Sequence, residues 1–91
     1  MEFEWDMVKA AGNLHKHGVS FQEAASVVGD FLGATVADPD HSVGVNRFIT
    51  IRLSNRGRLL MVAHAQRLDR VRIISARTLS RGEKRAYEET R

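Results

Sequence analysis

The hydrophobic pattern of this chain changes its period near residue 34, and this change sets the fold class. Before it, apolar residues recur at the spacing of amphipathic helices. After it, apolar and polar residues alternate, as in strands with one covered face. A further helical segment follows the strands. The 91 residues suffice for one core, so we expect a single α+β domain over 1–91.

Two helices are expected before the change. Asp6 is placed to cap the first, which runs to about Lys16, and Gly18 ends it in a left-handed conformation. The second opens with Ser20-Phe21-Gln22-Glu23, a capping box in which each polar side chain satisfies a backbone amide. One buried stripe then follows at helical spacing, formed by Phe21, Ala24, Ala25 and Val28.

The second half predicts an antiparallel sheet of three to four strands. The expected strands cover 35–37, 47–53, 59–65 and 70–76, with turns between them. Phe3-Glu4-Trp5 can add a short edge strand, and Trp5 is expected to anchor that segment to the core. A second capping box, Ser80-Arg81-Gly82-Glu83, opens a C-terminal helix to about Glu89 that has few apolar residues and should attach weakly.

Charge is sorted along the chain. Residues 1–45 carry two lysines against seven acidic residues, a net charge of −5. Residues 46–91 carry eleven arginines and one lysine against four acidic residues, a net charge of +8. A guanidinium is always charged and fits phosphate oxygens two at a time. The second half is therefore expected to contact nucleic acid.

The alternation within the strands indicates which arginines converge. Arg70 and Arg72 share one face, opposite Val71 and Ile73, and Arg77 lies at the strand end. Arg47 joins them if its strand presents it on the same side. The alternative is a solvated sheet face that prevents aggregation. Further RNA-contact candidates on the basic half are Arg52, Arg58, Arg70, Arg81 and Lys84.

Three residues are candidates for moving protons at an RNA 2′-hydroxyl. Glu83 and Tyr87 are four apart and share a helix face, and His64 lies in the strand beside the arginines. Each has a structural alternative: Glu83 as the capping-box residue, Tyr87 as a packing residue, and His64 as a core residue beside Leu60 and Val62.

No cofactor or metal site is expected. The chain has no cysteine, and His15 and His17 point in different directions. A site at His41 with its neighbouring aspartates is a minor alternative. The longest apolar stretch, Leu59–Ala63, is too short to span a bilayer, and the acidic start does not look like a signal peptide. We expect a soluble, cytoplasmic protein without membrane contact.

Taken together, these segments closely resemble the BrnT family, toxins of type II toxin–antitoxin systems. The resemblance covers nearly the whole chain in order, and its most specific parts are residues 16–21 and 72–77. It rests on Phe3-Glu4-Trp5-Asp6, Lys9, Asn13-Leu14-His15-Lys16-His17-Gly18-Val19-Ser20-Phe21, Glu23-Ala24-Ala25, Asp38-Pro39-Asp40-His41-Ser42, Arg47-Phe48-Ile49-Thr50-Ile51, Ser54-Asn55-Arg56-Gly57-Arg58-Leu59-Leu60, Arg72-Ile73-Ile74-Ser75-Ala76-Arg77 and Glu83…Arg85-Ala86-Tyr87-Glu88-Glu89.

The resemblance implies a RelE-like fold and a ribonuclease activity that arrests translation. It also implies a BrnA-like antitoxin with a ribbon-helix-helix part, through which the complex binds operator DNA. Such toxins depend on arginines assisted by lysine, glutamate or tyrosine. On this chain the catalytic candidates are Arg47, Arg72, Arg77, Glu83, Tyr87 and His64.

The chain departs from the family pattern at three places. Val45-Asn46 stands where relatives commonly carry acidic residues, Arg52 where glycine is usual, and Thr78-Leu79 where lysine-alanine is common. The last change removes a cation from the expected active edge. Two alternatives to a ribonuclease toxin therefore stay open: a largely non-catalytic, antitoxin-bound corepressor, and a generic single-strand RNA-binding module.

Overall fold

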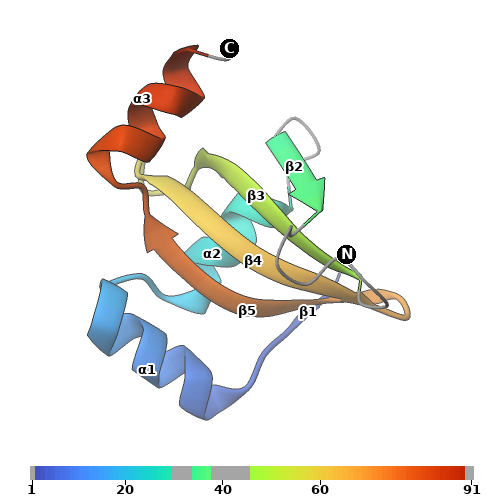
Figure 1. The fold of residues 1–91 in the computed structure, drawn as a ribbon. Coiled ribbons are helices and arrows are strands. Elements are labelled where there is room, and N and C mark those ends of the chain that lie inside the picture. Colours follow the sequence, from blue (N-terminus) through green and yellow to red (C-terminus); the bar gives the residue numbers. More distant parts are fainter. Residues whose placement is uncertain (1, 30–33, 38–45, 90–91) are drawn as a thin grey trace.

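The computed structural model describes residues 2–29, 34–37 and 46–89, and the structural statements below concern these residues. The expected order of helices, sheet and final helix is confirmed (Figure 1). The expected turn at 38–41, with His41, lies outside the described residues. The elements are β1 (Glu2–Glu4), α1 (Met7–His17), α2 (Phe21–Val28), β2 (Ala34–Ala37), β3 (Arg47–Leu53), β4 (Leu59–Arg67), β5 (Arg70–Thr78) and α3 (Arg81–Glu89).

The described strands form one mixed sheet in the order β1-β5-β4-β3-β2. The meander from β2 to β5 is antiparallel, as predicted, and the register is continuous between β3 and β4 but shifts once between β4 and β5. The sequence indicated three to four strands, and the sheet has five because β1 is a full member. It joins β5 in parallel, with Glu4 opposite Arg72. Parallel pairing is possible because two helices and the meander separate the two strands along the chain.

The core lies between α2 and one face of the sheet. Its largest fully buried side chains include Phe21 from α2, Leu60 from β4 and Ile73 from β5. Truncating a buried phenylalanine such as Phe21 costs about 3–5 kcal/mol. Trp5 packs edge-to-face on Phe21 with ring centroids 6.0 Å apart, so the prediction that Trp5 anchors the N-terminal segment is confirmed.

The helix ends follow the capping residues in the sequence. Asp6 Oδ1 accepts hydrogen bonds from the amides of Val8 and Lys9 at 2.8 and 3.0 Å. Gly18 ends α1 at φ 69°, a conformation that other residues adopt only with strain. At α2 only half of the capping box forms, because Ser20 Oγ accepts from the amide of Glu23 while the Glu23 carboxylate turns elsewhere.

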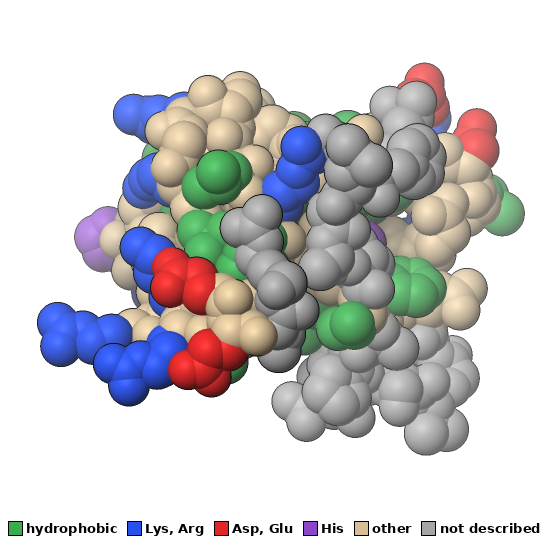
Figure 2. Space-filling view, turned by 90° about the horizontal axis from the view of Figure 1, so that it is seen from above, with side chains coloured by type: hydrophobic (Ala, Val, Ile, Leu, Met, Phe, Trp, Pro, Cys, Tyr) green, Lys and Arg blue, Asp and Glu red, His purple; other side chains and the backbone are tan. Residues whose placement is uncertain are grey.

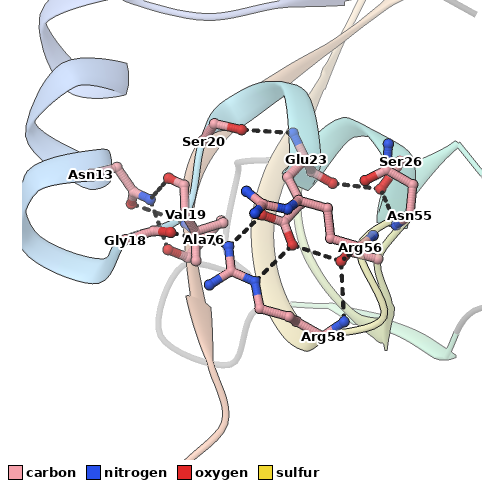
Figure 3. Close-up of polar contacts among 11 residues, drawn as sticks. Asn13, Gly18, Val19, Ser20, Glu23, Ser26, Asn55, Arg56, Arg58 and Ala76 are labelled. Atoms are coloured by element: carbon pink, nitrogen blue, oxygen red, sulfur yellow. Dashed lines mark hydrogen bonds and ion pairs between the residues drawn. The ribbon is translucent and has the colours of Figure 1, made fainter.

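That carboxylate joins α2 to the turn between β3 and β4 (Figure 3). Glu23 is only 3% exposed. Ser54 Oγ donates to its Oε2 at 2.6 Å, and Arg58 Nε donates to the same oxygen at 3.0 Å. The Arg58 guanidinium also contacts Oε1 and donates to the carbonyl of Gly18. These contacts, the Arg58 hydrogen bond first, hold the pKa of Glu23 below its ordinary value.

A second buried polar residue joins α1 to β5 (Figure 3). Asn13 Nδ2 donates to the carbonyls of Val19 and Ala76 at 2.9 and 2.8 Å. Its Oδ1 accepts from the amide of Ala76 at 3.1 Å. The side-chain amide therefore pairs with β5 as a neighbouring strand would, and it fixes where α1 lies.

Helix α3 follows β5 and projects beyond the end of the sheet (Figure 1). It has no buried residue and makes few contacts with the other described elements, in line with the weak attachment expected from its sequence. None of the helices in the described part of the chain combines the length and the apolar character needed to cross a membrane.

Candidate functional site

A β-bulge brings two of the predicted arginines to the same face of the sheet. In a regular strand, Arg72 and Arg77 would point to opposite faces, because they are five residues apart. The register between β4 and β5 shifts at Ala63/His64, so Arg72 lies opposite Ala65 and Arg77 lies opposite Met61. Ala65 and Met61 are four apart on β4 and share a face. The extra residue of the bulge therefore aligns the two guanidiniums.

The same registers place more arginines on this face. Arg47 of β3 lies opposite Ala65, so the condition under which it was expected to join the others is met. Arg70 lies opposite Arg67, also on this side. The core side chains Val71, Ile73 and Ala76 occupy the other side. We call this side the arginine face; it carries Arg47, Arg67, Arg70, Arg72 and Arg77.

The arginine face is extended rather than compact. Arg72 and Arg77 are aligned with β4 residues four positions apart, which corresponds to about 13 Å along the strand. The two side chains are therefore better placed for two separate phosphates of one RNA strand than for one shared phosphate.

Glutamates from the acidic N-terminal segment pair with the arginines of β5. Arg72 Nη1 lies 2.8 Å from Glu4 Oε2, and Arg70 Nε lies 3.3 Å from Glu2 Oε2. Arg67 is also within 3.8 Å of Glu4. Acidic residues of the N-terminal half thus neutralise part of the positive charge of the C-terminal half where β1 pairs with β5. Figure 2 shows basic and acidic side chains interspersed on the side of the molecule where α1 and α3 lie.

Arg77 is held by the first turn of α3. Its Nη1 and Nη2 donate to Oε1 and Oε2 of Glu83 at 2.7 and 2.8 Å, and Nη2 also contacts Met61 Sδ at 3.3 Å. Glu83 completes the predicted capping box, since its Oε1 accepts from the amide of Ser80 and its own amide donates to Ser80 Oγ. The Arg77 hydrogen bond is the main reason that the pKa of Glu83 is lowered to about 2. The pKa of Arg77 is raised by the same contact.

A cleft of about 490 Å³ lies between α3 and the turn that joins β3 and β4. It brings together three of the predicted residues, Arg52, Lys84 and Tyr87. Arg81 lies on the exposed first turn of α3, outside the residues that line this cleft. The remaining lining residues are Leu53, Gly57, Leu59 and Glu88.

His64 lies on the opposite side of the sheet from the arginines. It is 7% exposed, its Nε2 is 2.8 Å from Thr50 Oγ1, and its ring stacks on Phe48. Burial lowers its pKa. This position supports the core interpretation of His64 over its use as a base. Arg58 is likewise engaged with Glu23 and Gly18, and RNA contact by Arg58 stays a prediction.

Two residues of the site were not found from the sequence. Glu4 reaches Arg72 through a parallel strand pair that spans 68 positions, and Met61 reaches Arg77 only because of the bulge. Neither relation leaves a local signal. Within the described ranges, histidine and acidic side chains do not gather into a group of three or more that could hold a metal ion. His41 and Val45 lie outside those ranges.

Comparison with known proteins agrees with this architecture. The profile of the family described as "Ribonuclease toxin, BrnT, of type II toxin-antitoxin system" matches residues 5–83. No curated protein matches the chain significantly. Among solved structures, the crystal structure of the Brucella abortus ribonuclease toxin BrnT superposes with a TM-score of 0.69 at 20% identity, covering 89% of this chain and 99% of that one. That likeness confirms the α+β fold, and the family match covers most of the sequence, so the chain belongs to the BrnT family of ribonuclease toxins of type II toxin–antitoxin systems.

Proposed function

We propose that this protein is an endoribonuclease that arrests translation by cleaving RNA and is neutralised by a BrnA-like ribbon-helix-helix antitoxin. Membership of a ribonuclease toxin family supports the activity and implies an antitoxin. The structural observation that carries the proposal is the two-point contact of Arg77 with a carboxylate at the end of the arginine face. A phosphate presents two oxygens to a guanidinium in the same way.

In this proposal Arg77 binds the scissile phosphate and stabilises the negative charge that develops on it. Arg72, about 13 Å along β5, holds another phosphate of the same RNA. Arg47, on the same face from β3, helps to orient the chain. Because of this separation along β5, we assign Arg72 and Arg77 to two different phosphates.

Glu83 and Tyr87 move protons in the reaction. The RNA 2′-oxygen bonds to phosphorus as the bond from phosphorus to the 5′-oxygen breaks, which leaves a 2′,3′-cyclic phosphate and a 5′-hydroxyl. One proton leaves the 2′-hydroxyl and one reaches the 5′-oxygen. When phosphate replaces Glu83 on Arg77, the carboxylate loses the contact that lowers its pKa, and it becomes a stronger base. Tyr87, four residues along α3, donates the second proton.

The positive charge in this mechanism comes from guanidinium groups, so we propose a metal-independent activity. The antitoxin would cover the arginine face, and the toxin–antitoxin complex would reach operator DNA only through the antitoxin. The proposed site of action is the cytoplasm, where the RNA is.

The test is cleavage of a labelled RNA by the purified protein with and without a chelator. The proposal expects products with a 2′,3′-cyclic phosphate in both conditions, growth arrest when the chain is produced alone, and relief by co-produced antitoxin. RNA that stays intact at high enzyme concentration would contradict the proposed ribonuclease activity. Loss of cleavage in the presence of the chelator would contradict the proposed metal independence.

A second candidate function is a largely non-catalytic, antitoxin-bound corepressor. The observation that favours it is the engagement of Arg70, Arg72 and Arg77 with glutamates of the chain itself. Tight antitoxin binding and operator repression without RNA cleavage would support this candidate. All three pairs remain accessible to solvent. Because ion pairs that are open to solvent contribute little net stability, a phosphate can replace these glutamates, and we rank the nuclease first.

A further inference from the structure

The cleft beside α3 has a mixed lining. Leu53 and Leu59 lie directly opposite each other on β3 and β4 and form an aliphatic wall. Tyr87 supplies an aromatic ring, and Arg52 and Lys84 supply positive charge. Its volume of about 490 Å³ is in the range of small-molecule sites.

This combination fits a nucleotide better than it fits the other small ligands of an RNA-cleaving protein. A base has two flat apolar faces, which pack against an aromatic ring and aliphatic side chains, and its phosphate carries negative charge. A purely anionic ligand would not need the two leucines. A purely apolar ligand would not need Arg52 and Lys84. Glu88, at the rim, can accept a hydrogen bond from an exocyclic amino group of a base.

The cleft is continuous with the position proposed for the scissile phosphate. Leu59 and Met61 lie two residues apart on the same face of β4, about 7 Å from each other. Met61 Sδ contacts the Arg77 guanidinium. Lys84 and Tyr87 of the cleft follow Glu83, the partner of Arg77, on the same helix. An RNA strand whose scissile phosphate is bound to Arg77 can therefore place an adjacent base in the cleft.

We propose that the cleft formed by Leu53, Leu59, Tyr87, Lys84 and Arg52 binds the base of a ribonucleotide next to the cleaved bond and so sets the sequence preference of cleavage. This inference rests on the proposed ribonuclease function, because it assigns the cleft to the same substrate. The base lies between the tyrosine ring and the leucines, and the two cations hold the flanking phosphate.

The test uses the whole protein, labelled with nitrogen-15 and titrated with each of the four ribonucleoside 5′-monophosphates. Ribose 5-phosphate is the matched probe that lacks only the base. Nucleotides are expected to shift the backbone amide signals of Gly57, Lys84 and Tyr87, and at least one should bind about tenfold or more tightly than ribose 5-phosphate, as base stacking predicts. Equal affinity for the two probes, or shifts elsewhere only, overturns the proposal.

Two substitutions sharpen the test. Leu53→Glu places a carboxylate in the cleft at a side chain that is 59% exposed, so the fold is expected to persist. Leu68→Glu is the matched control, since Leu68 is 97% exposed and does not line the cleft. Leu53→Glu should weaken nucleotide binding about tenfold or more and should flatten the base preference of RNA cleavage, whereas Leu68→Glu changes neither. Unchanged binding in Leu53→Glu contradicts the assignment.

Failure of this inference is distinguishable from failure of the proposed function. RNA cleavage without base-dependent nucleotide binding leaves the ribonuclease and removes the base site. Base-dependent binding in the cleft without RNA cleavage leaves a nucleotide site and removes the nuclease.

Discussion

Glu83 holds Arg77 with both of its carboxylate oxygens and at the same time caps α3 through Ser80. Glu83 thus fixes the start of the last helix and also pairs with the arginine that we assign to the scissile phosphate. A phosphate that binds Arg77 through the same two nitrogens displaces this carboxylate. The helix keeps its capping contact from Ser80 Oγ when it does so.

The Glu83→Gln variant tests this exchange. Glutamine is also a capping-box residue, so α3 should begin at the same position. Without the negative charge, Arg77 is held less firmly, and we expect severalfold tighter binding of an RNA with a 2′-deoxy group at the cleavage position. Single-turnover cleavage of normal RNA should slow, because an amide cannot take the 2′-hydroxyl proton.

The matched control is Glu89→Gln, which removes an exposed charge from the same helix. Weaker RNA binding by Glu83→Gln contradicts the competition between Glu83 and phosphate. An undiminished cleavage rate removes Glu83 as the proton carrier.

The folded state should lose stability as the solution is acidified below about pH 6.5. Burial lowers the pKa of His64, so between the folded and unfolded pKa values the unfolded chain binds more protons. The contribution of neutral His64 to the free energy of unfolding is fully present above pH 6.5. It is lost as the pH falls through the lower pKa of the folded state. Urea unfolding at pH 7.5 and 5.5 measures it, and a His64→Gln variant should show a smaller difference. An equal difference in the two proteins would assign the loss to other groups.

Asn13→Ala should destabilise the protein by about 2–4 kcal/mol. The variant leaves the amide and carbonyl of Ala76 and the carbonyl of Val19 without the side chain that pairs with them at a buried site. Chemical denaturation provides the measurement, with Asn55→Ala, at an exposed turn position, as the comparison. A loss below that of Asn55→Ala would show that α1 is not fixed by this contact.

Leu68→Gly is expected to stabilise the protein by a few tenths to about 1 kcal/mol. Leu68 has φ 56° in the turn between β4 and β5, where a side chain is strained, and it is 97% exposed, so truncation loses almost no packing. Thermal unfolding monitored by circular dichroism detects the shift. A lower melting temperature would mean that the turn is not strained by Leu68.

Local signals in the sequence predicted most elements of this fold. Asp6, Ser20 and the Ser80–Glu83 box each cap the helix that they were expected to begin, and the strand expected over 47–53 has the bounds of β3. These signals act within a few residues, so they can be recognised without knowing the tertiary structure.

Contacts between residues that are far apart in the sequence could not be predicted from such local signals. The parallel pairing of β1 with β5 depends on how the whole chain folds, and so does the contact from Glu23 to Arg58 across 35 positions. The bulge in β5 is the decisive case for the site. Simple alternation separates Arg72 from Arg77, and only the register shift at Ala63/His64 returns them to one face.

The central claim is that the Arg77 guanidinium binds and stabilises the scissile phosphate. It is tested most directly by single-turnover cleavage of a short RNA by purified wild-type protein, Arg77→Lys and Arg77→Ala, with circular dichroism to confirm folding and Arg85→Ala as the charge-matched control. The account predicts a loss of about 100-fold or more in Arg77→Ala, a large loss in Arg77→Lys because lysine lacks the planar fork, and little change in Arg85→Ala. A folded Arg77→Ala protein that cleaves RNA at the wild-type rate would contradict it.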